Sequence, residues 1–214
     1  MSFFKYIAEL LRDPRGFIAS AIAMGPLVAY GFVFLVIFIE TGVVFFPFLP
    51  GDSLLFASGF FANGGGFNIA LLLPVVWVAA IAGDQCNFMI GHFFGRKIIE
   101  SGKVKAMTPE RIEKSEEFLN KWGKLAIFLG RFFPFIRTFV PFLAGMGGMH
   151  WRDFVIFNIL GGLTWSTGFT LLGYFFGGIP FVQEHFELLI VGIIGVSLVP
   201  TVFGLIKGRI NKGE

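Results

Sequence analysis

The stretch from Leu125 to Met149, LAIFLGRFFPFIRTFVPFLAGMGGM, holds two arginines in a segment that is otherwise almost uncharged. An arginine at hydrocarbon depth costs about 2.5 to 3.5 kcal/mol on insertion scales, so Arg131 and Arg137 need charged partners or water. Pro134, Pro141 and several glycines argue against one straight spanning helix. Irregular backbone occurs at membrane depth only where protein covers it or a water-filled cavity borders it. The stretch therefore predicts a broken, re-entrant segment whose arginines face such a cavity.

The composition of the whole chain is that of a membrane protein. Hydrophobic residues make up 55% of its 214 residues and charged residues only 14%, whereas a soluble domain carries about a quarter charged residues. Residues 1 to 24 predict an interfacial region, in which an amphipathic helix ends at the turn Asp13-Pro14-Arg15-Gly16. Apart from the arginine stretch, apolar segments are predicted at residues 26 to 45, 46 to 66, 69 to 95, 153 to 177 and 186 to 206.

Basic residues are concentrated outside the apolar segments. They lie in the N-terminal region, in a linker at residues 96 to 124 with eight Lys or Arg against five Glu, and in the tail at residues 207 to 214. The positive-inside rule places all three regions in the cytoplasm. Within the linker, Thr108-Pro109 predicts the start of a short interfacial helix. One face of that helix would carry Ile112, Leu119 and Trp122.

This orientation fixes the parity of the membrane crossings. Three apolar segments lie between the first two basic regions and three between the second and the third, yet each interval must contain an even number of crossings. One segment in each interval therefore turns back, and the proline- and glycine-rich segments 46 to 66 and 125 to 149 are the candidates. The prediction is an all-α polytopic membrane protein, with about four transmembrane helices and two re-entrant helical hairpins.

Short internal matches suggest that the two halves are repeats. Pro47-Phe48-Leu49 matches Pro141-Phe142-Leu143, and the run from Gly91 to Gly95 (GHFFG) matches the run from Gly173 to Gly177 (GYFFG). By the predicted topology the first hairpin enters from outside and the second from the cytoplasm, so the repeats are inverted. Inverted repeats with discontinuous helices that meet near the midplane are typical of secondary transporters.

Few charged residues fall in the interior of the apolar segments: Glu40, Asp52, Asp84, Arg131 and Arg137. In a functional interpretation the acids, with Glu40 and Asp52 as a pair, bind a proton or cation and the arginines bind an anionic substrate group, because guanidinium matches phosphate by bidentate hydrogen bonds. In a structural interpretation the same residues form an ion-pair network inside the membrane, or the acids lie at the outer interface. For Asp84 the two interpretations stand equal.

The hairpin bends are expected to depend on residues that break a helix or permit close packing: Pro50, Gly51, Pro134, Pro141 and Gly145. Asn87, Asn158 and Thr164 are interpreted as interhelical hydrogen-bonding residues, and Trp77, Trp151 and Trp165 as packing or interfacial residues.

The remaining reactive residue types give no sign of a catalytic or cofactor site. His92 lies at the cytoplasmic end of a span, where a histidine caps the helix or faces headgroups, and Cys86 is interpreted as a small core residue. The histidines and the cysteine lack metal-ligand spacing, and neither a nucleotide-type phosphate loop nor a nucleic-acid motif is present. No cofactor, metal or nucleic-acid partner is expected.

Three motifs resemble the DedA family, the bacterial branch of the SNARE-associated, VTT-domain membrane proteins. They are Glu40, the turn Phe48-Leu49-Pro50-Gly51-Asp52, and Arg131-Phe132-x-Pro134-x-x-Arg137 followed by Pro141 and Ala144-Gly145. The resemblance covers residues 25 to 206 and implies a polytopic inner-membrane protein with two opposed re-entrant hairpins, required for envelope homeostasis. It also implies lipid transport that depends on the proton-motive force, including the return of undecaprenyl phosphate, whereas eukaryotic relatives scramble phospholipids. The family's essential acids match Glu40 and Asp52, and its essential arginines match Arg131 and Arg137.

We therefore expect a lipid flippase, coupled to protons, that moves an anionic headgroup and is not an enzyme. Membrane lipids and protons are the expected partners, and a homo-oligomer is compatible with the sequence. A small-ion transporter or a membrane organiser is the alternative. A membrane-embedded lipid phosphatase is a weaker one: Pro50-Gly51-Asp52-Ser53 is similar to the PGxS turn of undecaprenyl-pyrophosphate phosphatases, but Leu54 and Leu55 stand where those enzymes carry an arginine and a second serine.

Overall fold

The computed structural model describes residues 14–43, 51–100, 109–133 and 136–186, together with residues 188 and 192. Within these residues every regular element is a helix. In chain order the helices are α2 (Pro14–Ala23), α3 (Pro26–Gly42), α4 (Gly51–Asn63), α5 (Ile69–Glu100), α6 (Pro109–Trp122), α7 (Leu125–Gly130), α8 (Ile136–Met146), α9 (Trp151–Phe176) and α10 (Pro180–Glu184). The predicted N-terminal amphipathic helix, Pro50, Pro134, the basic tail and most of the predicted segment 186 to 206 lie outside the described residues.

Two of the described helices are long and apolar enough to cross a membrane. They are Ile69–Gly95 within α5, and Trp151–Phe176, which is the whole of α9. Both coincide with predicted spans. α5 continues past the predicted end of its span to Glu100, and Lys97 in its last turn lies where the helix dipole favours a cation. α3 and α8 are apolar as well, but shorter.

Proline and glycine define the ends of the first two described helices. Pro14 begins α2, so Pro14, Arg15 and Gly16, which were predicted to form a turn, are helical. Proline is favourable at the first helical position, where the missing N–H has no intrahelical partner. Pro26 begins α3 in the same way, and Gly25 before it has a φ of 109°, which favours glycine. α3 ends at Gly42.

The arginine stretch is broken where the sequence predicts a break. α7 ends at Gly130 and α8 begins at Ile136, so two short helices that contact each other replace one straight helix. Of the other interrupted segment, α4 is described, whereas residues 44 to 50 lie outside the described part. Each short helix, α4 and α8, is followed by a long one, α5 and α9 respectively.

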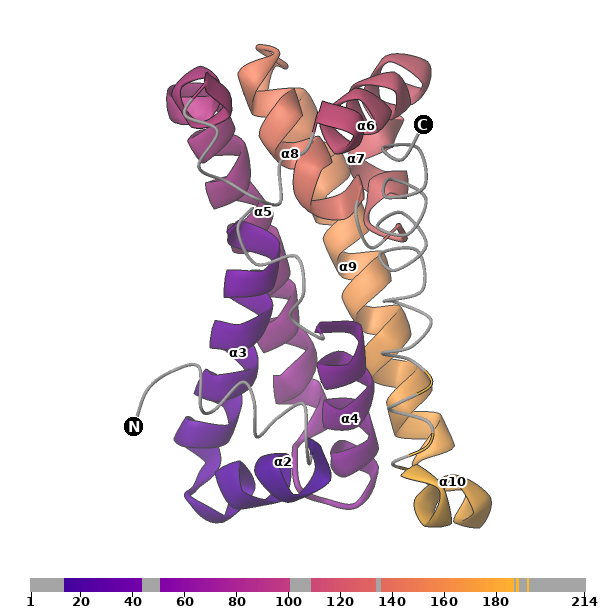
Figure 1. Cartoon of the computed structure of the whole chain (residues 1–214). Coiled ribbons are helices and arrows are strands. Elements are labelled where there is room, and N and C mark those ends of the chain that lie inside the picture. Colours follow the sequence, from indigo (N-terminus) through magenta and orange to yellow (C-terminus); the bar gives the residue numbers. More distant parts are fainter. Residues whose placement is uncertain are drawn as a thin grey trace, which may run out of the picture.

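Each of the two short helices, α4 and α8, packs against the long helix of the other half of the molecule. α5 and α9 run in opposite directions along the long axis, α4 lies along the lower part of α9, and α8 lies along the upper part of α5 (Figure 1). α3 packs beside α5. Each long helix therefore contacts the short helix of the other half.

Glycine residues allow the helices to approach closely in both contacts, the one between α4 and α9 and the one between α5 and α8. A Cβ atom on Gly59 of α4 would overlap the Thr170 carbonyl oxygen of α9, and one on Gly173 would overlap the Phe56 carbonyl oxygen. In the other contact, a Cβ on Gly145 of α8 would overlap the Phe88 carbonyl oxygen of α5. Small residues of this kind let helices approach closely in membranes.

The contact between α5 and α8 also contains a second glycine, as the contact between α4 and α9 does. A Cβ on Gly91 would overlap the Phe142 carbonyl oxygen, so the predicted match of Gly91 with Gly173 describes equivalent contacts. The match of Pro47 with Pro141 stays a prediction, because Pro47 lies outside the described residues, whereas Pro141 lies inside α8. Phe56 and Phe142, each three residues before its glycine, are the equivalent positions.

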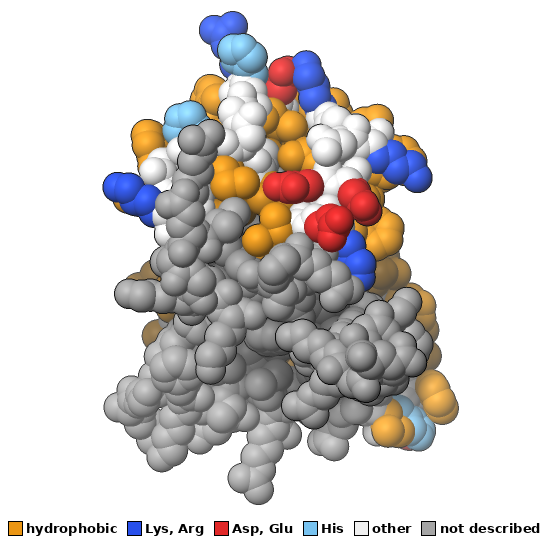
Figure 2. All heavy atoms as spheres, turned by 45° about the horizontal axis from the view of Figure 1, so that its top comes forward, with side chains coloured by type: hydrophobic (Ala, Val, Ile, Leu, Met, Phe, Trp, Pro, Cys, Tyr) orange, Lys and Arg blue, Asp and Glu red, His pale blue; other side chains and the backbone are white. Residues whose placement is uncertain are grey.

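α6 covers α8 at one end of the molecule. It begins at Pro109, as predicted, and Ile112 and Leu119 pack on the cluster of Phe139, Phe142 and Leu143. Trp122 was expected on the same face, but it is the last residue of the helix and is exposed. Charged side chains gather on this end of the molecule (Figure 2).

Candidate functional site

Five charged side chains are buried among the described residues, and they are the five that the sequence singles out: Glu40, Asp52, Asp84, Arg131 and Arg137. They come from different elements. Asp52 lies in the first turn of α4 and Arg137 in the first turn of α8, so the N-terminal ends of both short helices meet at this site. A helix N-terminus favours negative charge, because its backbone N–H groups are unpaired and its dipole is positive there.

Arg137 bridges the two acids that were expected to pair. Its Nη1 donates to Asp52 Oδ1 at 2.8 Å, and its Nη2 donates to Glu40 Oε1. The indole Nε1–H of Trp165 donates to the same Asp52 oxygen at 2.9 Å. Glu40, Asp52, Arg137 and Trp165 are called here the Arg137 cluster. It joins α3, α4, α8 and α9.

Gly51 is part of the wall of this cluster. The Glu40 carboxylate lies so close to Gly51 that a Cβ there would overlap it. The glycine predicted to bend the first hairpin is instead the first residue of α4, and it makes room for a buried acid. Pro141 and Gly145 both lie within α8, where Gly145 packs on α5.

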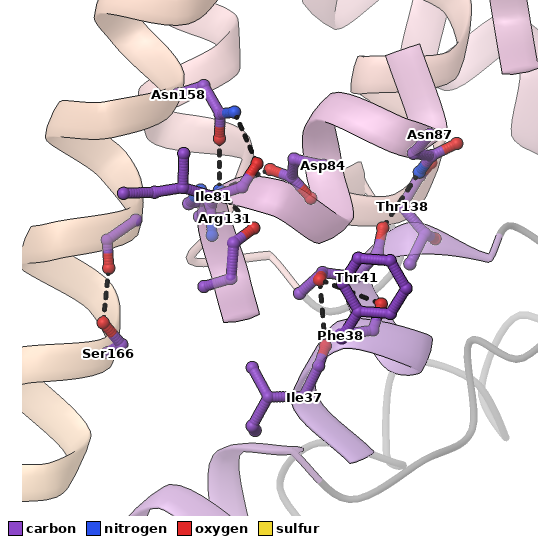
Figure 3. A network of polar contacts seen from close by, with 12 residues as sticks. Ile37, Phe38, Thr41, Ile81, Asp84, Asn87, Arg131, Thr138, Asn158 and Ser166 are labelled. Carbon is purple, nitrogen blue, oxygen red and sulfur yellow. Dashed lines mark hydrogen bonds and ion pairs between the residues drawn. The ribbon is translucent and has the colours of Figure 1, made fainter. Parts of the chain in front are cut away.

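Arg131 belongs to a second group of contacts, shown from close by in Figure 3. Its Nη2 lies 2.6 Å from Asp84 Oδ2, donates to Asn158 Oδ1, and lies 3.3 Å from the Ala80 carbonyl oxygen, to which it also donates. Asn158 in turn donates to the Ile81 carbonyl oxygen at 3.0 Å. Asp84, Arg131 and Asn158 are called here the Arg131 cluster. The predicted single group of acids and arginines is therefore two adjacent clusters.

Trp165 lies between the two clusters. Its ring is 5.4 Å from the Arg137 guanidinium carbon and 6.0 Å from that of Arg131, distances typical of cation–π contacts. The sequence analysis assigned it only to packing or the interface. Its spacing gives a signal that was missed: Asn158 and Trp165 are seven residues apart on one helix, which places them on the same face.

The other polar candidates have different surroundings. Asn87 donates to the carbonyl oxygens of Thr41 and Thr138, at 3.2 and 2.8 Å, and so links α5 to α3 and α8 as expected (Figure 3). Thr164 does not join helices: it is exposed and donates to the Leu160 carbonyl oxygen of its own helix. His92 is exposed, with its Nδ1 3.4 Å from the Gly145 carbonyl oxygen.

The described side chains pack tightly at this site. A pocket is lined by Thr41, Asp84, Arg131, Arg137 and Trp165, and the space between these side chains is too small for a water molecule. The five charges sum to minus one, because three carboxylates oppose two guanidinium groups. One proton or one monovalent cation brings the sum to zero.

The described residues contain no group of three or more His, Cys, Asp or Glu arranged to hold a metal ion. The site is thus a set of buried ion pairs, which hydrogen bonds from neighbouring side chains and the N-terminal ends of α4 and α8 stabilise. A charged centre of this kind, held between apolar helices of membrane-spanning length, defines an α-helical membrane protein whose polar core lies inside the bundle.

Comparison with known proteins identifies the family. The VTT domain model matches residues 49–175. The chain is 43% identical to protein DedA of Escherichia coli over 90% of its own length and 89% of that protein, and 39% identical to an uncharacterised membrane protein of Mycobacterium leprae over 91% and 84%. It is 30% identical to the inner membrane protein YghB of Escherichia coli over 85% and 86%. The chain belongs to the DedA family of VTT-domain membrane proteins. No solved structure matches it.

Proposed function

We propose that the protein is a proton-coupled transporter of the inner membrane that moves an anionic lipid headgroup from one leaflet to the other. One observation carries this proposal: the N-terminal ends of two opposed short helices meet at Arg137, whose guanidinium is held by two buried carboxylates. Discontinuous helices whose positive ends converge on one point are the anion sites of many secondary transporters.

In the proposed arrangement the molecule has about four transmembrane helices and two re-entrant hairpins. α4 belongs to one hairpin, and α7 with α8 forms the other, entering from the opposite side. The opposite directions of α5 and α9 and the equivalent glycine contacts of their short helices support an inverted repeat (Figure 1). The charged end around α6 (Figure 2) supports a cytoplasmic linker. α3 and α5 run in the same direction, so α2 lies at the other end of the molecule (Figure 1), and the described helices do not support the expected placement of residues 14–23 on the side of the linker.

Exchange of partners by Arg137 gives a mechanism for coupling. A phosphate group accepts the same two parallel hydrogen bonds from guanidinium that the carboxylates accept, so a headgroup can replace Glu40 and Asp52. Asp52 then keeps the hydrogen bond from Trp165. Arg137 is the one described side chain that donates to Glu40, so Glu40 is left buried without a counter-charge, with only the Gly51 backbone N–H among the described residues still donating to it. An unpaired charge in that position is costly, and uptake of a proton removes it.

The substrate class follows from the same chemistry. The lipid carries a phosphate headgroup, and undecaprenyl phosphate is the leading candidate, as the family resemblance implies, with anionic phospholipids next. The protein moves the headgroup without changing it. The acids act on protons and the arginine on the anion, and no step of this exchange makes or breaks a bond to phosphorus.

Reconstitution tests the proposal directly. Purified protein is placed in phosphatidylcholine vesicles that contain undecaprenyl phosphate or, in a parallel set, phosphatidylglycerol. The amount of each lipid in the outer leaflet is followed with and without an imposed pH gradient. We expect movement of the anionic lipid that the gradient accelerates, and no release of inorganic phosphate. Equal rates in protein-free vesicles would refute transport, and phosphate release would favour the phosphatase alternative.

A further inference from the structure

The two arginines are held in different ways. We infer that Arg131 is a positioning residue, fixed to α5 and α9 by Asp84 and Asn158, and that Arg137 alone exchanges its carboxylate partners for the lipid headgroup. This inference rests on the proposed function and divides its site into a fixed part and an exchanging part.

Arg131 is held by both long helices. Asp84 and the Ala80 carbonyl group belong to α5, and Asn158 belongs to α9. Asn158 is itself held by its hydrogen bond to α5. Any movement of the Arg131 guanidinium would therefore break contacts to both long helices at once.

α9 is also shaped to hold the Arg131 side chain. A Cβ atom on Gly161 would lie 3.0 Å from Arg131 Cδ, and one on Gly162 would lie 3.4 Å from Arg131 Nη2. These two glycines form a slot that the arginine fills. Arg131 is thus enclosed by backbone on one side and by its acceptors on the other.

Arg137 has more freedom. Its partners Glu40 and Asp52 lie in the last turn of α3 and in the first turn of α4, so neither is in the middle of a helix. The Asp52 and Arg137 side chains are 10% and 8% exposed, whereas those of Arg131 and Asp84 are 3% exposed. Charge also distinguishes the two clusters. Arg131 and Asp84 balance each other, so the excess negative charge belongs to the Arg137 cluster.

The turn between the arginines explains how one positions the other. Arg131 is the residue after α7, and the Phe133 N–H donates to the Gly130 carbonyl oxygen at 3.0 Å. The Arg137 N–H donates to the Phe133 carbonyl oxygen, also at 3.0 Å. Fixing Arg131 therefore fixes the start of α8, from which the Arg137 side chain reaches its partners.

Compensating neutralisation tests this division. Arg131→Gln leaves Asp84 buried without its counter-charge, so transport of undecaprenyl phosphate in phosphatidylcholine vesicles should fall by about tenfold or more and the melting temperature in detergent should drop. The double variant Asp84→Asn/Arg131→Gln removes both charges and keeps hydrogen-bonding groups. It should recover transport to within about threefold of wild type. The matched double variant Asp52→Asn/Arg137→Gln should insert but recover nothing.

The outcomes separate the inference from the function on which it rests. If wild-type protein moves no anionic lipid, the proposed function fails. If wild type is active and the folded Asp84→Asn/Arg131→Gln variant stays as inactive as Arg131→Gln, Arg131 binds substrate and the inference is overturned. Should that double variant fail to fold, Asn158→Ala decides: a lower maximal rate at an unchanged half-saturating lipid concentration supports positioning, and a raised half-saturating concentration contradicts it.

Discussion

Trp165 and Asp52 are joined by a hydrogen bond of 2.9 Å between the indole N–H on α9 and carboxylate oxygen Oδ1 on α4. The same oxygen accepts from Arg137 at 2.8 Å. Asp52 therefore has a second donor if Arg137 turns away, whereas Glu40 depends on Arg137 alone among the described side chains. In the proposed mechanism this difference gives the two acids of the Arg137 cluster different tasks: Asp52 stays in place as an anion, and Glu40 takes the proton.

The first prediction concerns the indole. Trp165→Phe keeps a ring face beside both guanidinium groups but removes the N–H, so Asp52 loses its second donor. We expect lipid transport to fall by about tenfold or more, since a hydrogen bond to a charged group contributes about 1.5 to 3 kcal/mol. Trp77→Phe is the matched control: it removes a 2.8 Å hydrogen bond to Thr167, away from the charges, and should transport normally. Equal loss in both variants would contradict the role given to Trp165.

The second prediction concerns the shape of the cation. Arg137→Lys keeps the charge but loses the planar fork that contacts Glu40 and Asp52 together. Transport should fall by about tenfold or more, with the half-saturating lipid concentration raised. Lys124→Gln is the control, because Lys124 pairs with Asp153 on the exposed surface, where an ion pair contributes little. Normal transport by Arg137→Ala would end the substrate-site proposal and leave a structural network.

The glycine contacts of the two short helices predict a symmetric pattern of stability. Gly59→Ala and Gly145→Ala both place a methyl group on a carbonyl oxygen of the opposite long helix, so both should lower the melting temperature in detergent by similar amounts. Gly168→Ala is the control: its position on α9 has no heavy atom within 4 Å, and the helix should gain up to about 1 kcal/mol. A marked drop at only one of the two contacts would argue against their equivalence.

Some features of the fold and of the site could be predicted from the sequence, and others could not. The break between α7 and α8, the long helices and the five buried charges follow from local patterns, because proline, glycine and isolated charges carry that information in the sequence itself. The pairing of Arg131 with Asp84 and of Arg137 with Glu40 does not. It depends on the packing of each short helix against the long helix of the other half, which is a long-range arrangement.

For Trp165, local sequence predicts one role and the tertiary fold provides another. Its apolar surroundings suggest packing, and only the tertiary fold brings Asp52 to its N–H. The Gly91 match succeeded because its glycines make a contact that only glycine permits.

Topology can be tested with single cysteines in a Cys86→Ser background. Position 101, outside the described residues, should react with an impermeant reagent from the cytoplasm only, as the basic linker predicts. Ser53 and Thr138 are buried in this structure. Cysteines at those two positions should therefore react slowly, and faster in the presence of transported lipid, when the helices separate. Labelling of position 101 from the periplasm would overturn the arrangement.

The last prediction separates proton coupling from passive scrambling. Because Glu40 loses its partner when Arg137 binds a headgroup, a proton must arrive at that step, and an imposed pH gradient should accelerate lipid movement. Glu40→Gln is permanently neutral, so it should lose the response to the gradient while keeping a residual, gradient-independent rate. Asp52→Asn should instead lose transport altogether, because the headgroup exchange needs the anion that Trp165 and Arg137 hold. The measurement is lipid movement in vesicles with and without an uncoupler. Wild-type transport that is indifferent to the uncoupler would leave a scramblase, and a Glu40→Gln variant that still responds to the gradient would place the proton elsewhere.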